Sequence, residues 1–265
     1  MPIFDKDASP GFWRPSPLAA GPFSGLQGGA IAGLLTAEVE TLAAVRSWGI
    51  AISVSVAFLK PTPMARLRTE ISALREGGRV SFVDNTLFAD NDTEPCATAR
   101  VTLINERRVD APPLAGARTD AADPTRYPER KVASFHGRPW MMDAMEARAG
   151  DGIAWFRQTE PMIAGAPART LSSIVGPADW AHGIARPLQN VLADPNPNLT
   201  VHLLRPREGD WVGIRAHATW ETQRGLGLGG GTVLDVHGEI GSVSMAVALL
   251  PFPKPAAVRT DRETA

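Results

Sequence analysis

Cysteine is almost absent from the sequence, and the residues that bind metals are scattered. Cys96 is the single cysteine among 265 residues, so no internal disulfide can form. The five histidines are dispersed, and no cluster of cysteine and histidine has the spacing of zinc ligands. We therefore expect no metal site, and a reducing compartment fits this composition.

An excess of basic charge is also lacking, as are long apolar runs. The net charge is −1, so no surplus of Lys and Arg can neutralise a phosphate backbone. Residues 1–16 contain acidic residues and prolines where a signal peptide has a basic start and an apolar core. No run approaches the roughly 18 apolar residues that a membrane span needs. We expect a cytoplasmic protein with no nucleic-acid partner and no membrane span.

The length is sufficient for two compact units. A chain of 265 residues can form two domains of about 130 residues, each with its own core. Residues 107–130 are rich in Pro, Ala and charge and have no apolar period, as is typical of a connector. We predict an N-terminal domain over 1–106, a linker over 107–130 and a C-terminal domain over 131–265.

The two halves resemble each other. Residues 54–61 (VSVAFLKP) alternate and end in a basic residue and Pro, and residues 199–206 (LTVHLLRP) do the same 145 positions later. Residues 96–104 and 242–250 also correspond, at an offset of 146. Two similar segments at nearly one offset indicate an internal duplication.

The order of predicted elements repeats as well. Residues 28–44 carry apolar side chains at spacings of three and four, which predicts a helix, and its counterpart is predicted over 170–184. Residues 155–157 are expected to open the second sheet. Four strands are predicted in each half, at 52–59, 66–74, 80–88, 96–105, 199–204, 211–221, 232–236 and 241–250. One helix followed by an antiparallel meander is an α+β pattern, with a long helix wrapped by a curved sheet.

These segments are similar to a known family. The run GLQGGA at 25–30, the strand VSVAFLKPTP and Gly78-Arg79 resemble the hotdog unit of acyl-CoA thioesterases. Residues 198–212, 224–227 and 234–241 resemble the second unit of the TesB-like group. The resemblance implies a double hotdog and hydrolysis of a fatty acyl-CoA to free acid and CoA. It also implies a role in fatty acid metabolism, with no metal and no organic cofactor.

The resemblance implies a catalytic set in the second half. Family members use an Asp on the helix, a Thr or Ser before the strand that ends in a basic residue and Pro, and a Gln on the last strand. These positions fall on Asp179, Asn196 and Met245. Methionine cannot donate a useful hydrogen bond, and losing one preorganised polar group costs about 10²- to 10³-fold in rate. The enzyme is therefore slow, uses a different set, or only binds acyl groups.

Asp179 and Asn196 each have a second interpretation. Asp179 fits an exposed helix carboxylate or a cap for a helix that restarts after Pro177. Asn196 lies in DPNPN, which is strong turn chemistry. As catalytic residues, Asp179 would orient and activate water and Asn196 would assist it.

The first half offers further candidates. Glu38 is the counterpart of Asp179 when the helices are overlaid, so it is an alternative catalytic carboxylate, or else an ordinary helix charge beside Glu40. Gly28 and Gly29 stand at a helix start, where a small residue lets a thioester carbonyl approach free N–H groups. We expect Gly28, Gly29 and Met245 to contact substrate, although the two glycines also fit a simple helix start.

Three hypotheses of function stay open. The first is an acyl-CoA thioesterase, the second a non-catalytic acyl-CoA or acyl-carrier binding protein, and the third a hotdog dehydratase or tailoring enzyme. The G-x-G-x-x-G run at 225–230 precedes a predicted strand and not a helix, which argues against dinucleotide binding. The two halves would pair through their sheets as a pseudo-dimer, and a homo-oligomer of such chains is open.

Overall fold

The computed structural model describes residues 1–22, 25–110, 121–132, 134, 137–165, 170–188 and 191–251. The helices are α1 (Gly28–Arg46), α2 (Ser172–Ala178) and α3 (Ala181–Ile184). The first six strands are β1 (Phe4–Lys6), β2 (Phe12–Pro15), β3 (Ile50–Phe58), β4 (Leu67–Arg75), β5 (Val80–Ala89) and β6 (Pro95–Ile104). The others are β7 (Met145–Gly150), β8 (Ile153–Gln158), β9 (Leu192–Ala193), β10 (Asn198–Leu203), β11 (Val212–Glu221), β12 (Leu226–Asp235), β13 (Gly238–Ala248) and β14 (Leu250–Pro251).

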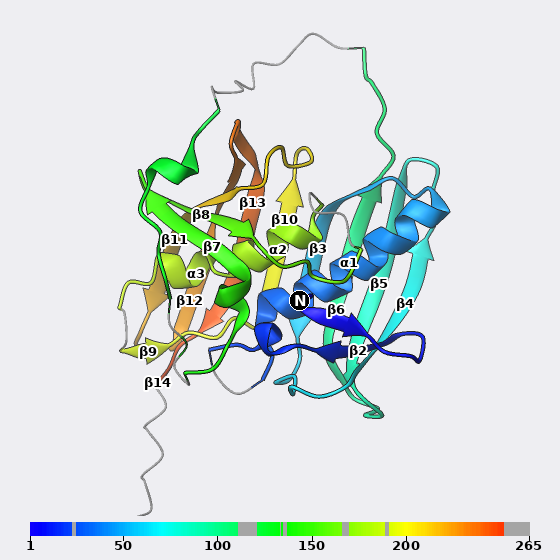
Figure 1. Cartoon of the computed structure of the whole chain (residues 1–265), viewed down its shortest axis with the longest axis horizontal. Helices are drawn as coiled ribbons and strands as arrows, with labels where there is room; N and C mark the ends of the chain where they lie inside the picture. The colour runs from blue at the N-terminus through cyan, green and yellow to red at the C-terminus, as the bar shows by residue number, and fades with distance from the viewer. Residues whose placement is uncertain are drawn as a thin grey trace, which may run out of the picture.

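Twelve of these strands form one antiparallel sheet. Their order is β1-β2-β4-β5-β6-β3-β10-β13-β12-β11-β8-β7, and β14 pairs separately with β9. Figure 1 shows this sheet curving around α1, α2 and α3. The backbone N–H groups of Ile3 and Phe4 donate to the carbonyls of Pro161 and Met162, which links β1 to the segment after β8. The described residues therefore form the predicted α+β arrangement of helices wrapped by a curved sheet.

The two halves meet at the centre of the sheet, where β3 pairs with β10. Ser55 is the partner of Thr200, and the Thr200 hydroxyl lies 3.2 Å from the Ser55 hydroxyl. These two residues are 145 positions apart, which is the offset of the sequence repeat. A residue on a two-fold axis pairs with its own equivalent, so this register places a pseudo-two-fold axis between β3 and β10.

The helix α1 is the core helix of the molecule. Gln27 caps its start, because the Gln27 side chain accepts a hydrogen bond from the Ala30 N–H, and Ser47 ends it in the left-handed conformation at φ 56°. Among the described residues α1 alone has the length and apolar composition of a membrane span, but 67% of that stretch is buried inside the protein. Its apolar composition is accounted for by burial on several sides rather than by a lipid environment.

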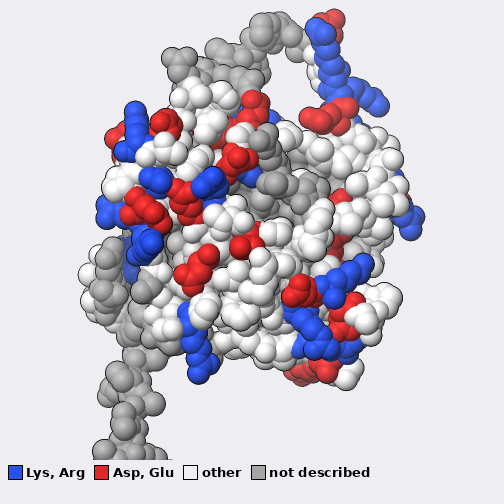
Figure 2. Space-filling model, viewed as in Figure 1, with Lys and Arg blue, Asp and Glu red and all other residues white. Residues whose placement is uncertain are grey.

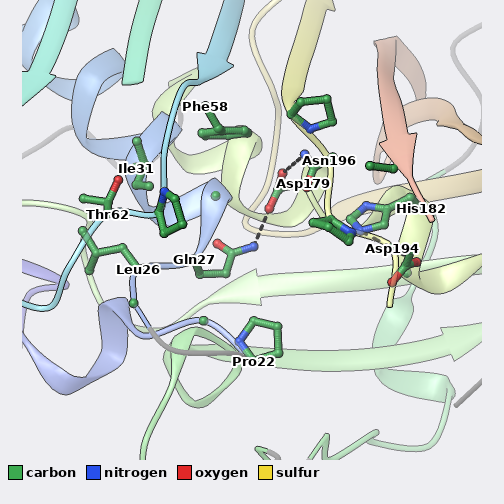
Figure 3. A pocket seen from close by; sticks show the side chains of 18 of the residues that line it. Pro22, Leu26, Gln27, Ile31, Phe58, Thr62, Asp179, His182, Asp194 and Asn196 are labelled. Carbon is green, nitrogen blue, oxygen red and sulfur yellow. Dashed lines mark hydrogen bonds and ion pairs between the residues drawn. The ribbon is translucent and has the colours of Figure 1, made fainter. Parts of the chain in front are cut away.

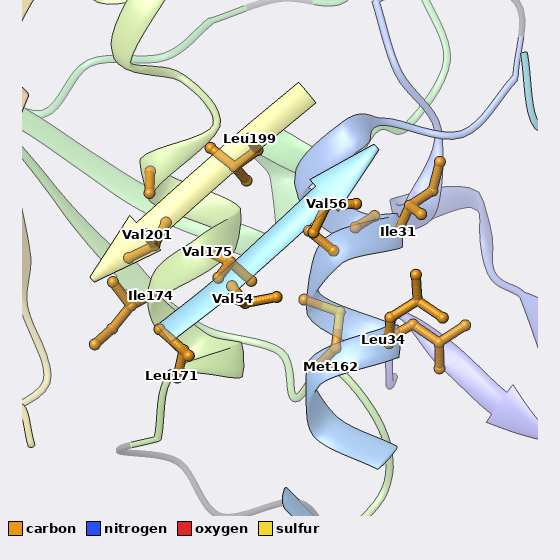
Figure 4. Packing of buried hydrophobic residues seen from close by; sticks show 14 of the residues in the cluster. Ile31, Leu34, Val54, Val56, Met162, Leu171, Ile174, Val175, Leu199 and Val201 are labelled. Carbon is orange, nitrogen blue, oxygen red and sulfur yellow. The ribbon is translucent and has the colours of Figure 1, made fainter. Parts of the chain in front are cut away.

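The helices and the central strands share one apolar core (Figure 4). Side chains of β3 and β10 point toward α1 and α2, and all of them are buried: Val54, Val56, Leu199, Val201, Ile31, Leu34, Ile174 and Val175. Burying one such side chain stabilises the fold by about 1.5–3 kcal/mol. The core therefore runs across the junction of the two halves and fixes α1 against α2.

The second predicted helix differs from expectation. One helix was predicted over 170–184, but the structure has α2 and α3, separated at Asp179 and Trp180. Pro177 lies inside α2 and has no N–H, and the Trp180 N–H donates to Pro177 O, three residues back, at 3.2 Å. This tight turn ends α2 and places Asp179 at its C-terminus.

The strand predictions are confirmed in position, with one large difference in length. β12 begins at Leu226 and not at 232, because its glycines pair on both sides: Gly230 is the partner of His217 on β11 and of Ser244 on β13. A Cβ atom on Gly231 would lie 2.6 Å from Arg215 O, so only glycine fits this close approach. β1, β2, β7 and β9 were not predicted, and the second half of the sheet opens with β7 and not at residues 155–157. The domain boundaries at 106 and 130 stay predictions, and residues 111–120 of the linker lie outside the described residues.

Charged side chains are mixed over the visible face. In Figure 2 Lys and Arg lie beside Asp and Glu, and no patch of one sign dominates this view. Acidic and basic side chains also pair directly, since Arg66 contacts both Asp7 and Asp90, at 3.1 Å and 3.0 Å. This face therefore lacks the basic stripe that a nucleic-acid site would present.

Candidate active site

A pocket of about 430 Å³ opens where α1 begins and α2 ends. Its walls come from both halves of the chain, from residues 25–28 and 58–62 of the first and 179–186 and 194–197 of the second. Figure 3 shows Asp179 inside this pocket, between Gln27 and Asn196. The pocket therefore lies at the junction of the two halves, where neither half alone could form it.

Three donors hold the Asp179 carboxylate. Its Oδ2 accepts from the Gly29 N–H at 2.9 Å and from Gln27 Nε2 at 2.5 Å, and its Oδ1 accepts from Asn196 Nδ2 at 2.8 Å. Asp179 is 3% exposed, so the interpretation as a surface carboxylate is wrong. Asp179 does lie at the end of α2, but its side chain points toward the start of α1 and does not cap α2.

Burial raises the pKa of Asp179 above the ordinary range of a carboxyl group. The electrostatic interaction with His182 opposes this rise, as do the hydrogen bonds from Asn196, Gly29 and Gln27. A buried carboxylate with a raised pKa that lines a pocket is the kind of group that can act as a general base.

Gly28 and Gly29 allow the two helices to approach at this point. A Cβ atom on Gly28 would lie 3.0 Å from Asp179 Oδ2, and one on Gly29 would lie 2.8 Å from Gly176 O. The Gly29 N–H is used by Asp179, whereas the Gly28 N–H has no partner among the described residues. Gly28 lines the pocket, so its N–H is available to a ligand.

Gln27 was not among the predicted site residues. Its side chain bridges the site, accepting from the Ala30 N–H at 2.9 Å and donating to Asp179. Gln is not a preferred N-cap residue, so a Gln directly before a Gly-Gly helix start is a sequence feature that indicates a role beyond capping. The contact itself joins residues 152 positions apart, which no local pattern reveals.

The structure brings Asn196 into the site but not Met245. Asn196 also donates to Asn198 O at 3.1 Å, so it is both a loop residue and a partner of Asp179. Met245 is buried on β13 and does not line the pocket, and its sulfur lies 3.1 Å from Nδ1 of His182. Met245 therefore does not form part of the pocket wall where a substrate contact was expected, because His182 lies between Met245 and the pocket.

Glu38 lies elsewhere in the first half and not beside Asp179. Its carboxylate accepts from Trp13 Nε1 at 2.9 Å, Thr69 Oγ1 at 2.8 Å and Asn85 Nδ2 at 3.1 Å. Burial raises the pKa of Glu38, and these hydrogen bonds oppose the rise. Its interpretation as an ordinary helix charge is thus wrong as well, because Glu38 joins α1 to the sheet through a buried polar cluster.

Two polar atoms of the pocket wall are buried without a partner among the described residues. They are Thr62 Oγ1 and Trp180 Nε1. A buried polar group usually has a partner, so these two atoms are exceptions. Within the same described residues no group of three or more His, Cys, Asp or Glu side chains could hold a metal ion.

Comparisons with known proteins show what the first half and the fold of the chain are similar to. The family model described as "Acyl-CoA thioesterase N-terminal domain" matches residues 17–104. The resemblance to acyl-CoA thioesterases is confirmed. The match to these thioesterases includes Gln27, Gly28 and Gly29, whereas Asp179 and Asn196 lie outside it. No curated protein matches the chain at a significant level.

Solved structures match over nearly the whole chain. A protein of Novosphingobium aromaticivorans has a TM-score of 0.72 and 16% identity, covering 95% of this chain and 100% of its own. A protein of Alicyclobacillus acidocaldarius with a hotdog fold has 0.69 and 15%, covering 94% and 96%. The acyl-CoA thioesterase II TesB2 of Mycobacterium marinum has 0.64 and 14%, covering 93% and 96%. These likenesses confirm the predicted double hotdog fold.

Proposed function

We propose that this chain hydrolyses an acyl-CoA thioester to the free acid and CoA by attack of an activated water. The observation that carries the proposal is the buried Asp179 carboxylate, held in a pocket by donors from both halves. The family match of residues 17–104 supports the reaction class. A fatty acyl group, a role in fatty acid metabolism, a homo-oligomer and a cytoplasmic location stay predictions.

Asp179 has room for one more hydrogen bond. A carboxylate offers about four lone-pair positions, and three are filled by Gly29, Gln27 and Asn196. Oδ1 accepts only from Asn196, so the remaining position lies on that oxygen. A water bound there would give its proton to Asp179 as its oxygen attacks the thioester carbon.

The N-terminus of α1 suits the negative charge that then develops. The Gly28 N–H lines the pocket and would donate to the former carbonyl oxygen of the substrate, with the helix dipole adding to this stabilisation. When the tetrahedral intermediate collapses, the C–S bond breaks, and the CoA thiolate takes the proton that Asp179 received. The apolar side chains of Ile31 and Phe58, which line the same pocket, would contact the acyl group.

Gln27 supports hydrolysis over passive binding. The binding-protein hypothesis was favoured by Met245 at the place where the family has Gln. Gln27 supplies an amide to the catalytic carboxylate from the other half of the chain, at 2.5 Å. The last strand has no Gln, but the site still contains a side-chain amide, because Gln27 provides one.

The first test is free-thiol release from acyl-CoAs of increasing chain length. We expect Asp179→Asn, which keeps the shape of the side chain, to lower kcat/KM by about 10²-fold or more. Because the base must be ionised and its pKa is raised, the wild-type rate should rise with pH beyond the ordinary carboxyl range. The matched control is Glu239→Gln, an exposed carboxylate, which should leave the rate unchanged.

The other outcomes are distinct. Thiol release that survives Asp179→Asn would keep the reaction and reject the site. If no acyl-CoA releases thiol from the wild type, hydrolysis is rejected and the acyl-binding hypothesis takes its place.

A further inference from the structure

A second, smaller pocket lies between the C-terminal half of α1 and the start of α2. Its volume is about 200 Å³, compared with about 430 Å³ for the pocket of Asp179. Glu40 and Ala44 of α1 form one wall, and the segments 49–51 and 170–171 form two others. Apart from Glu40 and Thr170 the wall is apolar or backbone, so the pocket offers one acidic end in an otherwise apolar hollow.

The two pockets are related by the internal repeat. A shift of 145 positions carries residues 49–51 onto 194–196 and residues 170–171 onto 25–26, and both targets line the larger pocket. The same shift carries Leu203 onto Phe58 and Pro206 onto Pro61. Seven of the nine residues around the smaller pocket thus have counterparts around the larger one. The pseudo-two-fold axis between β3 and β10 explains this correspondence.

Glu40 gives the smaller pocket its own carboxyl group. Glu40 Oε2 accepts from the Ser172 N–H at 3.4 Å, and the hydroxyls of Thr170 and Ser172 lie 3.0 Å from each other. Ser172 stands 145 positions after Gln27, so these two residues are equivalent in the repeat. Ser172 donates to Glu40 in the smaller pocket, as Gln27 donates to Asp179 in the larger one. Burial raises the pKa of Glu40, against these hydrogen bonds, which favours the protonated, hydrogen-bond-donating form.

The smaller pocket lacks parts of the hydrolytic arrangement. Ala51 stands where the larger pocket has Asn196, and Ile174 stands where it has Gly29. At the offset of 145 the counterpart of Asp179 is Leu34, which is not a carboxylate, and not Glu38 as the overlay of the two helices predicted. The acid and hydroxyl groups suit recognition of a carbonyl oxygen, whereas the amide and the glycine backbone that hold Asp179 have no equivalents.

We propose that the smaller pocket binds a second acyl group, with Glu40 and the Thr170 hydroxyl at its carbonyl end, and does not hydrolyse it. The proposal rests on the acyl-CoA chemistry proposed for the larger pocket. The smaller volume selects a shorter acyl chain than the larger pocket takes. The carbonyl end is that of an acyl-CoA or of a free carboxylic acid, since both present the same oxygen and apolar tail.

The test is calorimetric titration of the full chain with two probes. One probe is a ketone analogue of hexanoyl-CoA, in which a methylene group prevents hydrolysis, and the other is hexanoate. We expect the wild type to bind two equivalents of at least one probe. Two equivalents of the ketone alone identify the CoA thioester as the occupant of the second pocket, and two of hexanoate identify the acid product.

Blocking variants assign the second equivalent. Ala44 is exposed on α1 and lines the smaller pocket, so Ala44→Trp should fill its mouth without disturbing the core and reduce two equivalents to one. Val45→Trp is the matched control, because Val45 is 79% exposed, does not line the pocket, and should leave two equivalents. Glu40→Leu should weaken the second equivalent by about tenfold.

One equivalent or none in the wild type overturns the proposal, as do two equivalents in Ala44→Trp. Failure of the proposed hydrolysis is seen separately, as absence of thiol release from true acyl-CoAs by a chain that still binds the probes.

Discussion

At the scale of single residues, the site depends on Asp179 and on donors brought to it from distant positions. Gln27 and Gly29 come from the first half, and Asn196 comes from the loop before β10. Each donor fills one acceptor position of a buried carboxylate, and leaving such a position unfilled is costly. The donors therefore set both the orientation and the basicity of Asp179.

Gln27→Ala tests the donor that the other half supplies. We expect kcat to fall by about 10- to 10²-fold, because Asp179 loses its closest donor. The free energy of unfolding should fall by about 1 kcal/mol as well, since Gln27 also caps α1. Thiol release and thermal unfolding are measured on the same preparation, so a loss of activity is read only where the variant is folded.

The control for Gln27→Ala is Gln223→Ala, at an exposed turn between β11 and β12. It should change neither quantity. An unchanged kcat in folded Gln27→Ala would show that the amide has only a capping role.

Met245→Gln tests whether a Gln at this position of the last strand takes part in the site. The family pattern predicts that restoring the amide on the last strand increases activity, but Met245 lies behind His182 and outside the pocket. We expect no rise in kcat, and a decrease of about 1–3 kcal/mol in the free energy of unfolding, since the new amide is buried with few partners.

Met245→Leu is the apolar control and should cost less than about 1.5 kcal/mol. Urea unfolding and thiol release measure the two effects. A gain of tenfold or more in kcat for Met245→Gln would contradict the placement of this residue.

At the scale of elements, the segment after β10 is fixed to the end of β12 by a buried ion pair. Asp235, whose side chain is fully buried, accepts from Arg205 Nη1 at 2.5 Å and Nη2 at 2.9 Å. It also accepts from the backbone N–H groups of Glu208 and His237 at 2.9 Å and 2.8 Å. Burial opposes ionisation of Asp235, but the four donors together outweigh this effect and lower the pKa of Asp235.

Asp235→Ala should lower the free energy of unfolding by about 3 kcal/mol near neutral pH, because Arg205 and two N–H groups lose their acceptor. The pKa of Asp235 is lower in the folded state than its ordinary value of 3.8. Its stabilisation of the fold is therefore present above pH 3.8 and is lost as pH falls through the folded-state pKa. The difference between variant and wild type should therefore narrow in strong acid. Urea unfolding at several pH values measures it.

The matched control is Asp84→Ala. Asp84 makes a similar double contact with Arg100, at 2.8 Å and 2.8 Å, but on the surface. Such a pair contributes about 0–1 kcal/mol. An equal decrease in the free energy of unfolding in both variants would show that burial does not make the contacts of Asp235 more stabilising than those of Asp84.

At the scale of the whole molecule, the two halves form one structure. The sheet is continuous through β3 and β10, and the core runs from α1 to α2. A half that is alone would expose the edge of β3 or β10 and the apolar face of its helix. The pocket of Asp179 would be open as well, since its walls come from both halves.

Separate expression of residues 1–106 and 131–265 tests this dependence. We expect each half alone to aggregate or self-associate, and the two together to form a one-to-one complex that releases thiol from acyl-CoA. Size-exclusion chromatography and thiol release measure the outcome, with the full chain as the reference. A stable, cooperatively unfolding monomer of either half would contradict the dependence on the β3–β10 junction.

Local patterns determined much of the fold. The period of apolar residues predicted α1 and the strands of both meanders, because those elements are amphipathic or apolar over their own length. The repeat predicted the pairing of like halves, and the strand predicted after the glycine run at 225–230 argued against a nucleotide loop. The resemblance predicted Asp179 and Asn196, which the structure brings within 2.8 Å of each other.

Contacts between distant segments were decided only by the tertiary structure. Gln27 reaches Asp179 across 152 positions, Met245 is screened by His182, and Glu38 is held in a polar cluster away from the site. The single predicted helix is two, because Pro177 and the turn after it end α2. Periodicity reports which face of an element is apolar, but which side chains meet depends on how the two halves pack, and that is fixed by the register of β3 on β10.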